Sequence, residues 1–201
     1  MKVVLASKNP HKLVEISAIL KPLNIELVLE SDLGVDVEVE ETGQTFEENS
    51  FLKAHAVMEA TGLPALADDS GIAVDALGGA PGVHSARYGD DPSLDDWGRL
   101  LLLLKNTQQV PDGQRQAQFV SVITLVYPDG RMIQAGREAM GSFCGRPMEQ
   151  AASATTPFST IPCGKTFAEL TAGEKSQVSH RAVALKLFYE KLCQEAEYAD
   201  Q

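Results

Sequence analysis

Residues 1–29 read MKVVLASKNPHKLVEISAILKPLNIELVL, and this opening stretch decides the fold class. Lys2 to Ala6 favours a short strand, and Asn9-Pro10 then supplies a helix N-cap followed by proline at the first helical position. The apolar residues that recur at helical spacing behind this cap are Leu13, Ile16, Ile19 and Leu20. Because Ile25 to Leu29 favours a second strand, the chain is expected to open as strand, helix, strand.

The same alternation continues through the middle of the chain. Thr45-Phe46-Glu47-Glu48 has the spacing of a capping box and predicts a helix that runs to about residue 60. The other expected elements are strands at Ala65–Ala67 and Ile72–Leu77, a helix at Ser93–Lys105, a strand at Ala117–Tyr127, its hairpin partner at Arg131–Glu138, and a helix at Ser179–Cys193. Alternating strands and helices with a central hairpin predict an α/β fold with a mixed sheet flanked by helices.

Length and composition indicate one compact domain. With 201 residues, of which 44% are hydrophobic, the chain can bury a substantial core, and we expect a single two-lobed domain over 1–196 followed by a polar tail at 197–201. The apolar stretch at the N-terminus is too short for a signal peptide or a membrane span. The widely spaced Cys144, Cys163 and Cys193 fit neither a disulfide framework nor a zinc site, which favours the cytoplasm.

The net charge of the chain limits the kinds of molecule that it is expected to bind. A formal net charge of −11 argues against a protein that coats nucleic acid, because the phosphate backbone favours a basic surface. A small phosphorylated substrate is compatible with an acidic chain if a local group of cationic side chains, or a divalent cation, neutralises it.

The first group of candidate site residues lies between the opening strand and its helix. Ser7-Lys8-Asn9-Pro10-His11-Lys12 places free amides and the positive end of a helix dipole where a phosphate could bind, and Lys12 could add a direct charge. The alternative is an ordinary helix cap followed by a solvated lysine.

The second group is acidic. Asp68-Asp69 is expected at the end of a strand, and Glu40-Glu41 lies in an acidic stretch ahead of Thr42-Gly43. Converging carboxylates can hold Mg²⁺, and one carboxylate could instead orient or deprotonate a water that attacks phosphorus. The alternative is that Asp68-Asp69-Ser70-Gly71 is simply a turn, since these residue types favour turns.

The third group opens the last helix. Ser179 can cap this helix, and His180 and Arg181 would project from its first turn, with Glu174-Lys175 shortly before. Cations at a helix N-terminus oppose the dipole, and such local conflicts are typical of functional sites. Together, the three groups indicate a nucleoside triphosphate bound with Mg²⁺.

These residues resemble the inosine/xanthosine triphosphate pyrophosphatase (ITPase) family over nearly the whole chain. The most specific run is Leu63 to Tyr88, with LPALADDSG, GGAPG and SARY in order. Further matching segments are Ser7-Lys8-Asn9 with Lys12, Glu40-Glu41-Thr42-Gly43, Thr45-Phe46-Glu47-Glu48-Asn49, Gly164-Lys165-Thr166-Phe167-Ala168-Glu169-Leu170, Lys175, and Ser179-His180-Arg181.

The resemblance implies a two-lobed α/β homodimer that hydrolyses ITP, dITP and XTP to the monophosphate and pyrophosphate, with the substrate between the lobes and Mg²⁺ required. Asp69 would be the general base, and Glu41 and Asp69 would serve the metal. Substrate would be bound by Ser7, Lys8, Asn9, Lys12, Ser70, Lys175, His180 and Arg181. Asn49, Lys53 and Asp68 would support the phosphate and metal site.

The chain departs from the family at residues 148–157, where MEQAASATTP replaces a segment containing Gly-Phe-Gly-Tyr-Asp-Pro. Ala152 stands at the position of the stacking phenylalanine and Thr155 at that of the aspartate, with Ser153 and Ala154 between them. One allowed codon spelling of residues 148–158, read from its third base, encodes Gly-Ala-Gly-Gly-Phe-Gly-Tyr-Asp-Pro-Ile. We therefore hypothesise two compensating single-base changes around this segment; the alternative is a real divergence.

Two other functions remain open. The first is a catalytically impaired nucleotide-binding paralogue that lost its base pocket, against which the retained Lys12, Asp69 and Arg181 argue. The second is a nucleotide pyrophosphatase of the related Maf type that acts on pyrimidine nucleotides. Leu63–Tyr88 and Ser179–Arg181 favour the ITPase assignment over the second.

Overall fold

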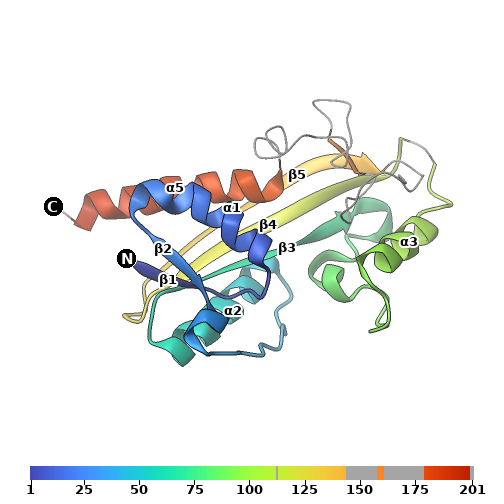
Figure 1. Ribbon diagram of the computed structural model, residues 1–201. Helices are drawn as coiled ribbons and strands as arrows, with labels where there is room; N and C mark the ends of the chain where they lie inside the picture. Colours follow the sequence, from blue (N-terminus) through green and yellow to red (C-terminus); the bar gives the residue numbers. More distant parts are fainter. Residues whose placement is uncertain (112, 144–157, 161–178, 200–201) are drawn as a thin grey trace. The chain divides into compact units, whose positions relative to one another are not determined.

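The computed structural model describes residues 1–111, 113–143, 158–160 and 179–199 (Figure 1). In chain order the elements are β1 (Lys2–Leu5), α1 (Pro10–Leu20), η1 (Lys21–Leu23), β2 (Glu26–Leu29), η2 (Glu30–Leu33), α2 (Phe46–Thr61), β3 (Ala65–Val74), η3 (Asp75–Leu77), η4 (Gly82–Arg87), α3 (Asp96–Asn106), β4 (Gln116–Val126), β5 (Met132–Phe143), β6 (Phe158–Thr160) and α5 (His180–Ala199), where η marks a 3-10 helix.

The strands form one mixed sheet of six strands in the order β2-β1-β3-β4-β5-β6. β1 pairs in parallel with β2 and with β3, and β5 pairs antiparallel with β6. Gly130, at a φ of +86°, lies in the tight turn that joins β4 to β5, and Tyr127 N donates to Arg131 O across this turn at 2.9 Å. The predicted α/β class with a mixed sheet and a central hairpin is confirmed.

The chain divides into two compact units, which matches the expected two lobes. The first contains Met1–Asp69, Ser121–Arg137 and Val183–Gln201, and the second contains Ser70–Val120 and Glu138–Ala182. Asp69 and Ser70 are consecutive residues of β3, so the chain passes from the first unit to the second within that strand.

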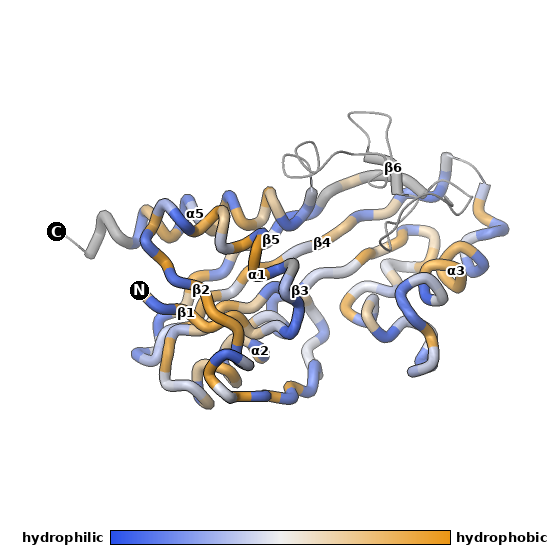
Figure 2. The backbone as a smooth tube through the Cα atoms, viewed as in Figure 1, coloured by the Kyte–Doolittle hydropathy of each residue, from blue (hydrophilic) through white to orange (hydrophobic). Residues whose placement is uncertain are grey.

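The first unit has a core on each face of β1. Val3 and Leu5 belong to a buried cluster with Ile16 of α1 and Phe188 of α5, whereas Val4 belongs to another cluster with Val57 of α2. Successive side chains of a strand point to opposite faces, so α1 and α5 cover one face and α2 covers the other. Figure 2 shows the matching alternation of hydrophobic and hydrophilic residues along α5.

The second unit has a smaller core. Its buried members are Ile72, Val74, Leu100, Leu103 and Ala117, from β3, α3 and β4. Asp95 caps α3 by accepting a hydrogen bond from Gly98 N at 2.7 Å. No helix in the described part of the chain is both long and apolar enough to cross a membrane.

Local signals placed several element ends correctly. Helix α1 begins at Pro10, and Thr45 Oγ1 accepts from Glu48 N at 3.1 Å while Glu48 Oε2 accepts from Thr45 N at 3.2 Å, as a capping box requires. Gly62 ends α2 in the left-handed conformation at a φ of +66°. Helix α5 continues to Ala199, into the segment expected to be a polar tail.

The interruption expected at Asp68-Asp69-Ser70-Gly71 is wrong, because β3 runs without a break from Ala65 to Val74. The two aspartates therefore lie inside the strand, with only 2% and 7% of their surfaces exposed. A buried charge needs partners, and both carboxylates find them in residues distant in sequence. A short helix, η4, lies between β3 and α3.

Candidate active site

Asp68 holds the ammonium group of Lys12 against β3. Asp68 Oδ1 accepts a hydrogen bond from Ser121 Oγ at 2.9 Å, and Asp68 Oδ2 lies 3.1 Å from Lys12 Nζ. Lys12 Nζ also donates to the backbone oxygen of Asp68 at 3.2 Å. These contacts compensate the burial of the Asp68 carboxylate and fix the position of a cation that starts from the first turn of α1.

Asp69 shares a second cation with Glu41. Lys53 of α2 places Nζ 2.5 Å from Asp69 Oδ1 and 3.1 Å from Glu41 Oε1. The other oxygen of Asp69, Oδ2, is buried and has no hydrogen-bond partner among the described residues. Asp69 therefore has one oxygen paired with a lysine and one that remains available to a ligand.

Burial dominates the electrostatics of this pair. Burial raises the pKa of Asp69 above its ordinary value of 3.8, although the charge and hydrogen bond of Lys53 oppose the rise. For Lys53, burial alone would lower the pKa, but the attraction and hydrogen bonds of Asp69 and Glu41 outweigh it and raise the pKa. Lys53 thus stays charged, while Asp69 binds a proton more readily than an exposed aspartate.

The carboxylates of Glu41 and Asp69 fit Mg²⁺ as part of a shared site. Within the described residues, no three side chains of histidine, cysteine, aspartate or glutamate converge as a complete metal site. Nucleotide enzymes commonly hold Mg²⁺ through one or two carboxylates and complete its coordination with phosphates and waters. The unpartnered Oδ2 of Asp69 is the hard oxygen donor that such an ion requires.

Asn49 holds the segment that carries Glu41. This fully buried side chain accepts from Gly43 N at 2.8 Å and donates to Gly43 O at 3.3 Å. A Cβ atom on Gly43 would lie 2.6 Å from Asn49 Oδ1, so the close approach requires glycine. Asn49 is therefore placed to position the backbone next to Glu41.

The loop after β1 has the expected place and its own internal contacts. Ser7 Oγ accepts from Asn9 N at 3.2 Å, and Asn9 O accepts from Leu13 N at 3.4 Å at the start of α1. Lys8 Nζ lies 2.6 Å from the exposed carboxylate of Asp36, whose hydrogen bond raises the pKa of Lys8. Lys8 would have to leave this surface ion pair to contact a phosphate.

In the second unit, the basic start of α5 meets the sheet. Ser179 Oγ accepts from Ala182 N at 3.1 Å, as predicted for the helix cap. Arg181 Nη2 lies 3.4 Å from Ser70 Oγ on β3, and His180 stacks on Phe119 of β4. These contacts stabilise two cationic residue types where the helix dipole is unfavourable to them.

The profile of the Ham1 family matches residues 3–191 of the chain. The chain belongs to the Ham1 family. A relative from Shigella flexneri named dITP/XTP pyrophosphatase is 46% identical over 196 residues, covering 95% of this chain and 98% of that relative.

Solved Ham1 structures agree with the fold. The structure of a HAM1 protein from Coxiella burnetii is 34% identical, with a TM-score of 0.88 over 96% of this chain and 99% of that one. The nucleoside-triphosphatase / dITP/XTP pyrophosphatase of Mycobacterium abscessus is 41% identical, with a TM-score of 0.78 over 93% and 98% of the two chains. The resemblance found in the sequence is confirmed.

Some residues of this Ham1 protein were missed by sequence reasoning, and some lie outside the described residues. The second group comprises Lys175, Ala152, Ser153, Ala154 and Thr155. Ser121 and Phe119 were missed because β4 was assigned only as a strand. The signal for Ser121 was a serine inside the apolar run FVSVITLV, where a buried hydroxyl needs a partner.

Proposed function

We propose that this chain hydrolyses the non-standard purine nucleotides ITP, dITP and XTP to the monophosphate and pyrophosphate. The proposal is supported by the names of the relatives from Shigella flexneri and Mycobacterium abscessus. The observation that carries it is Asp69, a buried carboxylate inside a strand, with one oxygen paired to Lys53 and the other without a partner in the described residues.

In this proposal, Asp69 accepts a proton from a water molecule while the oxygen of that water forms a bond to the α-phosphorus. The bond from that phosphorus to the bridging oxygen breaks, and pyrophosphate leaves. Because burial raises the pKa of Asp69 toward the working pH, its carboxylate is a better base than an exposed aspartate. Lys53 keeps the carboxylate in place through Oδ1 and leaves Oδ2 for one of two roles, as the base toward the water or as a ligand of Mg²⁺.

Cations would bind the rest of the substrate. Glu41 and Asp69 would hold Mg²⁺, which when bound neutralises phosphate charge and polarises the phosphoryl group. Lys12, held by Asp68, and the loop of Ser7, Lys8 and Asn9 would bind the triphosphate, where amides and cations favour anions.

The nucleoside would be contacted by other residues. Ser70, Lys175, His180 and Arg181 take this role in the proposal, as the family resemblance implies. The homodimer and the cytoplasmic location belong to the same proposal: the first rests on the resemblance, and the second on the unpaired pattern of three cysteines.

Pyrophosphate release tests this function directly. ITP, XTP and UTP are incubated with the purified chain, with Mg²⁺ and with a chelator, and Asp69→Asn is compared with the native protein. We expect Mg²⁺-dependent release from the purine substrates and a loss of about 10²–10⁴-fold in Asp69→Asn, the range for removal of a general base. Asp129→Asn, which removes an exposed carboxylate near a turn, should keep full activity.

Each alternative predicts its own result. Faster release from UTP would favour the Maf type, and nucleotide binding without release would favour the impaired paralogue. Full activity in Asp69→Asn would overturn the proposed role of Asp69. Calorimetry of Mg²⁺ binding to the native chain and to Asp69→Asn distinguishes a role as general base from a role as metal ligand. If Asp69→Asn loses activity but keeps the native Mg²⁺ affinity, Asp69 is not a principal ligand.

A further inference from the structure

Phe119 and His180 form a nearly parallel aromatic stack in the second unit. Their ring centroids lie 4.8 Å apart with an angle of 13° between the planes. Phe119 comes from β4, and His180 is the first residue of α5. The stack therefore joins a strand of the central sheet to the helix end that carries the basic pair.

A second contact anchors the next residue of the same turn. Arg181 Nη2 lies 3.4 Å from Ser70 Oγ on β3, the strand beside β4. Consecutive residues of a helix point about 100° apart, since 3.6 residues make one turn. Two contacts in different directions therefore help to set the orientation of the His180 and Arg181 side chains in this first turn.

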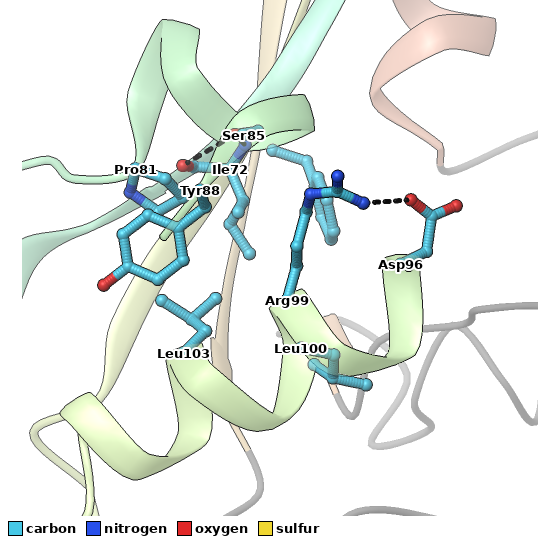
Figure 3. Close-up of a pocket in the computed structure, with 9 residues that line it drawn as sticks. Ile72, Pro81, Ser85, Tyr88, Asp96, Arg99, Leu100 and Leu103 are labelled. Carbon is cyan, nitrogen blue, oxygen red and sulfur yellow. Dashed lines mark hydrogen bonds and ion pairs between the residues drawn. The ribbon is translucent and has the colours of Figure 1, made fainter. Parts of the chain in front are cut away.

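Phe119 also borders a cavity of about 210 Å³, whose walls come from β3, η4, α3 and β4. Figure 3 shows Tyr88, Arg99 and Leu103 around it. Phe119 also packs against the buried cluster that contains Ile72 and Leu103, so this cluster and the stack together place its ring.

We propose that Phe119 is a positioning residue for nucleotide recognition: its ring sets the plane of the His180 imidazole and the orientation of the first turn of α5. This inference rests on the proposed function, in which His180 and Arg181 contact the nucleotide. A stack engages the faces of the two rings, whereas imidazole forms hydrogen bonds through its in-plane nitrogens. Phe119 can thus orient His180 without using those atoms.

The departure at residues 148–157 gives this role more weight. By the family resemblance, Ala152 stands at the position of a stacking phenylalanine, and alanine would not supply that aromatic contact to the base. Discrimination between bases then depends more strongly on His180 and Arg181 being presented in one orientation.

Proton NMR of the histidine side chains tests the stack itself. The chain has four histidines, and His180→Gln assigns the signal of interest. We expect the His180 ring protons to be shifted upfield by the Phe119 ring, the shift to vanish in Phe119→Leu, and a comparable shift to remain in Phe119→Tyr. Leu103→Ala is the matched control, since it shortens a side chain in the same apolar cluster and borders the same cavity.

Steady-state kinetics test the consequence. Phe119→Leu should raise KM for ITP about three- to tenfold, the equivalent of one aromatic pair, with kcat within about twofold. Phe119→Tyr should restore the native KM, and Leu103→Ala should keep it. Equal increases of KM in Phe119→Leu and Leu103→Ala would reduce Phe119 to a packing residue.

The NMR arm does not require turnover, so the two proposals can fail separately. If the native chain releases no pyrophosphate, the proposed function fails, and the affinity of the variants for ITP, measured by titration, still tests Phe119. An unshifted His180 signal in the native chain would overturn the positioning role whatever the activity.

Discussion

Lys53 donates to Asp69 Oδ1 at 2.5 Å, and the two side chains are only 18% and 10% exposed. This pair lies 16 residues apart in sequence and joins α2 to the middle of β3. Because Glu41 lies 3.1 Å from the same ammonium group, Lys53 neutralises two carboxylates at once. Lys53 is therefore a main contributor to the stability of the first unit, and it lowers the proton affinity of Asp69 more than Lys12 does.

Removing that cation should destabilise the protein. Lys53→Met leaves two carboxylates without their shared partner, and we expect the free energy of unfolding to fall by about 3 kcal/mol, the lower end for a broken buried pair. Urea denaturation at neutral pH measures this loss. Lys53→Arg keeps the charge and should recover most of it, whereas Lys21→Met, at an exposed position, should change little. Equal stability of Lys53→Met and the native chain would contradict the arrangement.

The loss of activity at acid pH should follow the protonation of Asp69. Its pKa is raised by burial, so kcat/KM should begin to fall at a higher pH than an ordinary aspartate would require, as protonation removes the base. Lys53→Met removes the cation that most strongly opposes this rise and should move the acid limb further toward neutral pH. The measurement is kcat/KM against pH at saturating Mg²⁺, and an acid limb unmoved by Lys53→Met would count against Asp69 as the group that titrates.

The contribution of charged Lys53 to stability should be lost only at alkaline pH. Its pKa is raised in the folded state, so its stabilising contribution is complete below the ordinary value of 10.5 and is lost as pH rises through the folded value. The difference in unfolding free energy between the native chain and Lys53→Met should therefore shrink only in strongly alkaline solution. Urea denaturation at pH values from neutral to alkaline measures this difference. A difference that shrank already at neutral pH would contradict a raised pKa of Lys53.

Two buried serines offer a matched test of the phosphate site. Ser121 Oγ donates to Asp68 Oδ1 at 2.9 Å, whereas Ser50 Oγ donates to the backbone oxygens of Ala67 and Val122 at 3.2 and 3.1 Å. Ser121→Ala and Ser50→Ala should each lower stability by about 1–3 kcal/mol, since each leaves a buried acceptor with one partner fewer. Only Ser121→Ala should raise KM for ITP, because it alone loosens the carboxylate that holds Lys12.

The departure at residues 148–157 has a genetic and a biochemical test. Resequencing the gene decides between the two readings, since codons that cannot encode the Gly-Phe-Gly-Tyr-Asp-Pro segment in another frame would eliminate the frame-change hypothesis. If the polypeptide carries Ala152 and Thr155, discrimination between ITP and ATP should be blurred, because base stacking is worth about 1–3 kcal/mol. Sharp discrimination by that polypeptide would refute the expectation.

Local physical chemistry was enough for much of this fold. Pro10 begins α1, the Thr45–Glu48 capping box begins α2 and Gly62 ends it, each through contacts within a few residues of chain. Matching motifs also indicated the family. Lys12 pairs with Asp68 and Lys53 with Asp69 on β3, whereas the roles of these residues in a phosphate and metal site stay predictions.

Only the tertiary structure decided that the Asp68-Asp69 pair lies inside a strand and not in a turn. Its residue types favour a turn, yet β3 is continuous, because partners from other elements compensate the burial of the carboxylates. These partners are distant in sequence: Lys12 is 56 residues from Asp68, and Ser121 is 53 residues from it. The same holds for Arg181 and Ser70, separated by 111 residues, and for the stack of His180 on Phe119. Propensity describes a residue's neighbours in the chain, whereas the free energy of a buried charge depends on its neighbours in space.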